Sequence, residues 1–118
     1  MTKARLNVGT VLWVTEFAYA GMAGGKQAPG VVLTSHEYHE KRSDVIVARI
    51  TSKMHHAPGF GAVTIRDWSL CGLGKPSVIK PFLMTISQSQ ILRIAGELDT
   101  QTLADLKSAF RAVFPLAS

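Results

Sequence analysis

Two apolar runs that lie close together in the chain constrain its fold more than any other feature. Residues 30–35 and 44–52 are rich in Val, Ile and Thr, and both runs end in hydroxyl side chains. β-Branched residues favour extended backbone, so the runs are predicted to be neighbouring antiparallel strands joined by the short polar stretch 36–43. The consecutive apolar residues Val45 to Val47 indicate that both faces of the second strand are buried. The hydroxyl groups are therefore expected at one edge of a sheet, where the chemistry should lie.

Length and composition fit a single domain spanning residues 1–118. Hydrophobic residues make up 47% of the chain and charged residues 18%, which is enough apolar material for a buried core. Thirteen Lys and Arg residues against eight Asp and Glu residues leave a net charge of +5. This excess favours anionic partners such as nucleic acid or an acidic protein, although a merely solubilising surface explains it equally well.

The single cysteine, Cys71, excludes a disulfide within the chain and suits a reducing compartment. Its neighbours Leu70 and Gly72 favour a small buried apolar side chain over a nucleophile. Residues 1–6 carry two cations, but no long apolar stretch follows them. We therefore expect no signal peptide, no membrane contact and a cytoplasmic location.

Further strands and one helix complete the predicted fold. The remaining strand candidates are residues 8–17, 62–65 and 77–80, the last of them closed by Pro81. Glycine-rich stretches at 18–27 and 52–61 are predicted to be loops. Capping-box spacing at 87–90 predicts a short helical turn that ends near Gly96.

The last part of the chain has helical periodicity. Apolar residues recur at spacings of three and four from Leu103 to Phe114, which predicts a helix that starts at Asp99 or Thr100 and stops before Pro115. Several short strands followed by one helix indicate a mostly β fold with helical cover. The expected architecture is a small antiparallel barrel with a C-terminal α-helix.

No nucleotide-binding glycine motif, zinc-spaced cysteine set or Gly-x-Ser-x-Gly motif occurs, so we expect neither a cofactor nor a metal. His36 and His39 lie close to Glu37 and Glu40, and such a group could bind a metal ion. A solvated turn is the preferred interpretation of that polar cluster.

The order of these pieces resembles the MazF/PemK family of toxins from bacterial toxin-antitoxin systems. The matching stretches are residues 9–14, a glycine-rich loop, 28–33, 45–52, 72–73 with 76–80, and 94–98 before the last helix. The resemblance implies an SH3-like or CcdB-like barrel, a homodimer, and metal-independent cleavage of single-stranded mRNA through the RNA's own 2′-hydroxyl. It also implies neutralisation by a small acidic antitoxin.

The residues that carry the family's chemistry are only partly present. Ala28, before Pro29, stands where the family has an arginine, and Phe82 stands where some members have an aspartate. The hydroxyl at the end of the third strand is kept as Thr51, and the cation after the Ser-Val-Ile strand is kept as Lys80. The resemblance therefore implies Thr51 and Lys80 as the catalytic contacts to the scissile phosphate.

The side chains expected to hold RNA are cationic, polar or aromatic and flank these strands: Phe17, Lys26, Gln27, Ser52, Lys53, His55 and His56. Either histidine could serve as general acid or base because imidazole titrates near neutral pH, and exposed loop histidines are the alternative. Trp13 is predicted to belong to the core, and the alternative is that it stacks on a base at the groove side that the resemblance implies. Arg49 is predicted to face solvent, a dimer partner or RNA, because burying an unpaired arginine is costly.

Two other functions remain open at this point. A non-catalytic module that binds RNA or the antitoxin would account for Ala28 and Phe82. A CcdB-like gyrase inhibitor, acting through its terminal helix, would share the fold, and the basic middle of the chain argues mildly against it.

Overall fold

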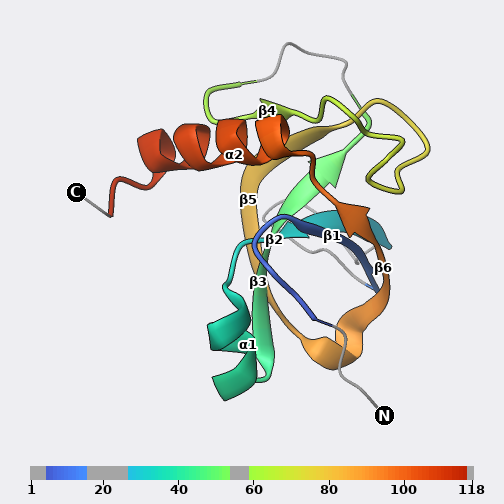
Figure 1. The fold of residues 1–118 in the computed structure, drawn as a ribbon, viewed down its shortest axis with the longest axis vertical. Helices are drawn as coiled ribbons and strands as arrows, with labels where there is room; N and C mark the ends of the chain where they lie inside the picture. Colours follow the sequence, from blue (N-terminus) through green and yellow to red (C-terminus); the bar gives the residue numbers. More distant parts are fainter. Residues whose placement is uncertain (1–4, 16–26, 54–58, 117–118) are drawn as a thin grey trace.

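A computed structural model describes residues 5–15, 27–53 and 59–116 of the chain (Figure 1). The elements in chain order are β1 (Thr10–Val14), β2 (Ala28–Val32), α1 (His36–Lys41), β3 (Asp44–Thr51), β4 (Val63–Thr64), β5 (Val78–Ser87), a 3₁₀ turn (Gln88–Gln90), β6 (Ile91–Glu97) and α2 (Thr100–Val113). The strands form one sheet in the order β4-β5-β3-β2-β1-β6, and all the pairings are antiparallel.

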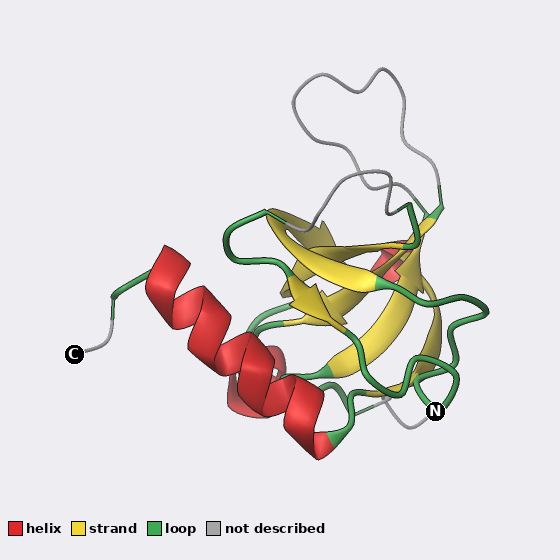
Figure 2. Cartoon of the chain, turned by 90° about the horizontal axis from the view of Figure 1, so that it is seen from above, coloured by secondary structure: helices red, strands yellow, loops and turns green. Residues whose placement is uncertain are grey.

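The predicted mostly β fold with a C-terminal helix is confirmed, but the barrel is not closed. The sheet curls strongly (Figure 2), yet within the described ranges β4 and β6 end the ladder without pairing to each other. Neither of the helices in the described part of the chain has the length and apolar character needed to cross a membrane.

The two apolar runs of the sequence form the predicted antiparallel pair. In the β2–β3 register Gly30 lies opposite Arg49, and Val32 lies opposite Val47. Side chains on a strand alternate between its faces, so Val45 and Val47 point to one cluster of buried residues while Ile50 points to another. The prediction that both faces of β3 are covered is confirmed.

Helix α2 covers one of these two clusters. Leu106 is 2% exposed within the cluster, and Leu103 and Phe110 pack against it. The helix begins where expected, because the Asp99 side chain accepts the backbone N–H of Thr102. Cys71 lies in the same cluster, and burial raises the pKa of its thiol. Cys71 is thus a buried apolar side chain, as predicted.

Several local predictions were wrong, and the structure gives the cause of each. Residues 36–41 form helix α1, whose start is capped by the Ser35 side chain accepting the Tyr38 N–H. The predicted helical turn ends at Gln90, because residues 91–97 pair with β1 as strand β6 instead of remaining helical up to Gly96. The capping box at Ser87 and Gln90 is present as predicted.

Pro81 does not close a strand, since β5 continues through it. Ile79 pairs with Ile50 and Leu83 pairs with Ala48, so three residues of β5, including Pro81, lie opposite Arg49 alone. A bulge of this kind leaves residues outside the regular ladder, and a proline is tolerated there because it has no N–H to donate.

His39 is buried rather than solvated. Its Nδ1–H donates to the Leu6 carbonyl, and its Nε2 bonds the Thr34 hydroxyl, so the ring ties α1 to the first residues of the described chain. Within residues 5–15, 27–53 and 59–116, no three His, Cys, Asp or Glu side chains gather closely enough to hold a metal ion. His39 therefore has a structural role in the protein.

Candidate functional site

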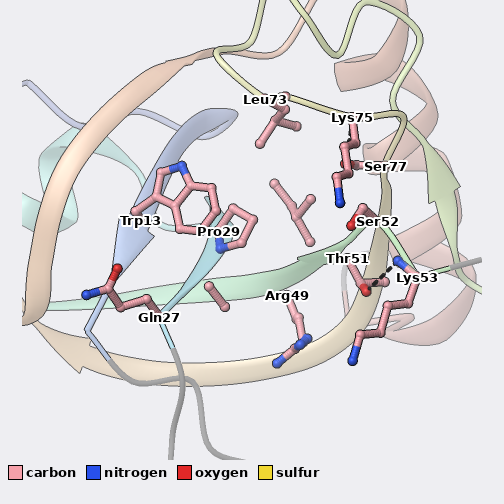
Figure 3. Close-up of a pocket in the computed structure, with 13 residues that line it drawn as sticks. Trp13, Gln27, Pro29, Arg49, Thr51, Ser52, Lys53, Leu73, Lys75 and Ser77 are labelled. Atoms are coloured by element: carbon pink, nitrogen blue, oxygen red, sulfur yellow. Dashed lines mark hydrogen bonds between the residues drawn. The ribbon is translucent and has the colours of Figure 1, made fainter.

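A pocket of about 350 Å³ lies where β1, β2 and β3 meet the loop before β5 (Figure 3). Its volume falls in the range of small-molecule sites. The residues that line it are Trp13, Gln27, Ala28, Pro29, Arg49, Ile50, Thr51, Ser52, Lys53, Leu73, Gly74, Lys75 and Ser77.

The end of β3 supplies the polar side of this pocket. Arg49 and Thr51 are two residues apart and therefore lie on the same side of the strand, and both are half-buried. The Thr51 oxygen accepts the backbone N–H of Lys53 at 3.1 Å (Figure 3). That bond uses a lone pair of the hydroxyl oxygen, so the O–H hydrogen of Thr51 can still be donated to a ligand.

An apolar wall comes from β1 and β2. Trp13 lies opposite Pro29 in the β1–β2 register, and their rings stand on one side of the pocket (Figure 3). The Arg93 guanidinium lies 5.0 Å from the centre of the Trp13 ring, which holds the indole in place by a cation–π contact. Trp13 was predicted to belong to the core, but it is half-buried and lines the pocket.

The charge in the pocket has one sign. Arg49, Lys53 and Lys75 supply cations, and none of the described residues that line the pocket is acidic. The hydroxyl of Ser77 donates to the Lys75 carbonyl at 2.9 Å, which fixes the loop that carries Lys75. Three cations beside a flat apolar wall suit a ligand with an anionic group and an aromatic ring.

The structure brings some of the predicted site residues together. Thr51, Ser52, Lys53 and Gln27 line the pocket. Lys80 is not among the lining residues, and its amine lies 5.6 Å from the centre of the Phe82 ring. The predictions for Phe17, Lys26, His55 and His56 lie outside the described residues.

Lys75 and Ser77 were not predicted as site residues, because only the pairing of strands brings them to the pocket. Thr51 pairs with Val78, so the residues just before β5 lie beside the end of β3. Both strands were predicted, but their pairing with each other was not. Nothing in the neighbouring sequence distinguishes Lys75 from an ordinary loop lysine.

The sheet is open, curled and antiparallel, and a terminal helix covers one of its faces. These features, with a cationic pocket at the ends of the central strands, define the class of protein as a small β protein with a cationic cleft. The family of PemK-like, MazF-like toxins of type II toxin-antitoxin systems matches residues 8–114. The chain belongs to this family, as its resemblance in sequence implied.

Solved structures of such toxins share the fold. MazF from Deinococcus radiodurans superposes with a TM-score of 0.75 at 19% identity, covering 97% of this chain and 100% of that one. Toxin MazF-mt6 of Mycobacterium tuberculosis gives 0.73 at 22%, covering 92% and 99%. A mycobacterial endoribonuclease in complex with its cognate antitoxin gives 0.72 at 14%, covering 98% and 99%. No curated protein sequence matches the chain.

Proposed function

We propose that this toxin-family protein is an endoribonuclease that cleaves single-stranded RNA, with the reacting phosphate held in the pocket at the end of β3. The observation that carries the proposal is that Arg49, Lys53, Lys75 and Thr51 line one pocket, together with the aromatic ring of Trp13. Cations and a hydroxyl donor bind phosphate oxygens, while an indole stacks on a base.

The reaction is a transesterification within the RNA. The 2′-oxygen attacks the adjacent phosphorus, so a bond from phosphorus to the 2′-oxygen forms and the bond to the 5′-oxygen breaks. The 2′-hydroxyl loses one proton and the departing 5′-oxygen gains one. The products are a 2′,3′-cyclic phosphate and a 5′-hydroxyl, with no change of oxidation state and no added reactant. Negative charge grows on the phosphate oxygens during attack, so fixed donors and cations accelerate the step.

The pocket residues have distinct roles in this scheme. Thr51 donates its O–H to a phosphate oxygen, while Lys53 and Lys75, both exposed, draw in the RNA backbone. Lys80 stays a predicted phosphate contact; it lies within β5, in the bulge opposite Arg49. The proton transfers are assigned, as a hypothesis from the sequence, to His55 or His56.

The proposed physiological setting is a cytoplasmic homodimer that a small acidic antitoxin neutralises. One solved relative of the same fold is an endoribonuclease in complex with its cognate antitoxin. The net charge of +5 favours an acidic partner, and a cationic pocket is a suitable place for an acidic segment to compete with RNA.

Incubating the purified protein with single-stranded RNA in EDTA tests the proposed activity. We expect fragments that end in 2′,3′-cyclic phosphate and begin with a 5′-hydroxyl, identified by mass spectrometry. RNA that binds but stays intact at high protein concentration would contradict the enzyme and support a binding module. Intact RNA together with gyrase trapped on DNA would support the gyrase inhibitor instead.

Replacing the Thr51 hydroxyl tests the proposed site. Thr51→Val keeps the shape of the side chain but removes its donor, and we expect kcat to fall about 10²-fold. Thr51→Ser keeps the hydroxyl and should retain most of the activity. Equal kcat values for the wild type and Thr51→Val, measured on one RNA substrate, would refute the role of Thr51.

A binding module without cleavage is the second candidate. The observation that favours it is that the described residues lining the pocket include no carboxylate or imidazole to accept the 2′-hydroxyl proton. Such a module would bind RNA through the same cations. The product analysis above separates the two functions.

A further inference from the structure

We propose that Arg49 is the catalytic residue that neutralises the reacting phosphate, holding two of its oxygens with its guanidinium group. This inference rests on the proposed endoribonuclease function and assigns its central electrostatic role to one side chain. Four features of the structure support it: the place of Arg49 in β3, its partners in the two neighbouring strands, its side of the strand and the chemistry of its side chain.

Arg49 occupies an unusual place for a charged residue. β3 is a central strand with β2 on one side and β5 on the other, and the neighbours of Arg49 along the chain, Ala48 and Ile50, are 0% and 1% exposed. An apolar residue would satisfy the strand without any desolvation of charge. An arginine here places a cation in the lining of the pocket, where an anionic ligand can meet it.

Both neighbouring strands have an unusual feature opposite Arg49. On β2 the paired residue is Gly30, which has no side chain. On β5 the bulge around Pro81 lies opposite Arg49 and interrupts the regular ladder. Glycines within strands and bulges both occur where a ligand or a functional side chain needs space. Here they flank the same residue from opposite sides.

Arg49 also lies on the same side of β3 as Thr51, and both line the pocket. Their donors can therefore converge on one phosphate. Lys53 and Lys75 lie on exposed backbone beyond the strands and carry compact point charges. A guanidinium is planar and can bind two oxygens of one phosphate at once, so Arg49 is the lining cation best suited to the reacting group.

The test compares Arg49→Met and Arg49→Lys with the wild type. Arg111→Met, in the last turn of α2 and outside the pocket lining, is the control because it removes the same charge. We would measure kcat and KM on an RNA with one cleavage site, and the Kd for the same RNA with a 2′-deoxy group at that site. Circular dichroism and thermal unfolding would establish that each variant is folded.

We expect kcat to fall about 10²- to 10³-fold in Arg49→Met, while the Kd for the uncleavable RNA rises less than about tenfold. Arg49→Lys keeps the charge without the planar fork, and its kcat should fall at least about tenfold. Arg111→Met should leave kcat unchanged. If Arg49→Met does not fold, the lysine variant decides the matter, and a wild-type kcat there would overturn the proposal.

Failure of the inference is distinguishable from failure of the proposed function. A wild-type protein that binds RNA without cleaving it would remove the enzyme and, with it, a catalytic Arg49. A wild type that cleaves, with folded Arg49 variants that cleave equally fast, would overturn only the role of Arg49. An Arg49→Met variant with a raised KM and an unchanged kcat would likewise overturn it, because the contact would then serve binding alone.

Discussion

At the scale of single residues, Asp99 links the start of α2 to the segment that follows β4. Its carboxylate accepts the N–H of Thr102 at 2.9 Å and the Thr102 hydroxyl at 2.6 Å. The Thr102 oxygen in turn accepts the N–H of Arg66 at 3.0 Å. Partial burial raises the pKa of the Asp99 carboxyl, but the hydrogen bonds from Thr102 and from the Asp67 backbone together outweigh that effect, so the pKa lies below its ordinary value.

Asp99→Ala removes this cap, and we expect the free energy of unfolding to fall by about 1 to 2 kcal/mol, as for other N-cap losses. Urea unfolding followed by circular dichroism at neutral pH measures the change. A loss below about 0.3 kcal/mol would mean that packing of the apolar face alone fixes the start of α2. Asp99→Asn is the matched variant, because it keeps an acceptor and cannot ionise.

The lowered pKa of Asp99 also sets the sign of a pH effect. The unfolded chain binds a proton at about pH 4, whereas the folded protein does so only at lower pH. The stabilisation is therefore complete above about pH 4 and is lost as the pH falls through the folded-state pKa. The stability difference between the wild type and Asp99→Asn should shrink over that acid range.

At the scale of elements, the loop before β5 packs closely against β6 at Gly72. The same loop lines the pocket. The φ of Gly72 is +78°, and a Cβ at this position would collide with the backbone carbonyl of Ala95 in β6. Gly74, two residues later, has φ outside the left-handed region and no atom near an added Cβ. The two glycines therefore form a matched pair for substitution.

We expect Gly72→Ala to lower the free energy of unfolding by at least about 2 kcal/mol, since it combines left-handed strain with a steric clash. Gly74→Ala should leave stability unchanged or raise it by about 0.5 kcal/mol, because alanine restricts the unfolded chain. Denaturant unfolding of both variants checks the difference. Equal stabilities would show that the loop can move away from β6 at little cost.

Elements with a strong local signal could be predicted from the sequence. The β-branched runs of β2 and β3 and the periodic apolar face of α2 are visible in short windows of sequence, and their pairing and capping followed from them. Strand β6 could not be found in this way, since its partner β1 lies about 80 residues earlier and the local capping box indicated a helix. Long-range pairing overrode the local preference.

The same contrast between local signals and long-range pairing explains which site residues could be predicted. Thr51 was predicted from the family resemblance, and Ser52 and Lys53 because they directly follow a recognisable strand. Lys75 reaches the pocket through the pairing of Thr51 with Val78, and Trp13 reaches it because β1 packs beside β2 with Pro29 opposite. The bulge at Pro81 was hidden because a proline in a strand ordinarily marks its end.

At the scale of the whole molecule, the net charge is +5, and three of the cations line the pocket. Two clusters of buried residues occupy the opposite faces of a curled sheet, α2 covers one of them, and the pocket lies at the ends of the strands between β2 and the loop before β5. The strands are thus a rigid support for cations at their ends. RNA binding should therefore depend on salt in proportion to the number of those cations.

We expect the affinity for an uncleavable single-stranded RNA to fall as salt rises from about 50 to 200 mM, with a log–log slope near −2 if three cations contact phosphates. Lys75→Met should reduce that slope by about 0.7, because each contact to single-stranded RNA releases roughly that share of a counterion. Lys107→Met, on the exposed side of α2, is the control and should leave the slope unchanged. Fluorescence anisotropy titrations measure all three slopes. If Lys75→Met and Lys107→Met change the slope equally, binding reflects the overall charge of the molecule, and the pocket is not the place where RNA phosphates are held.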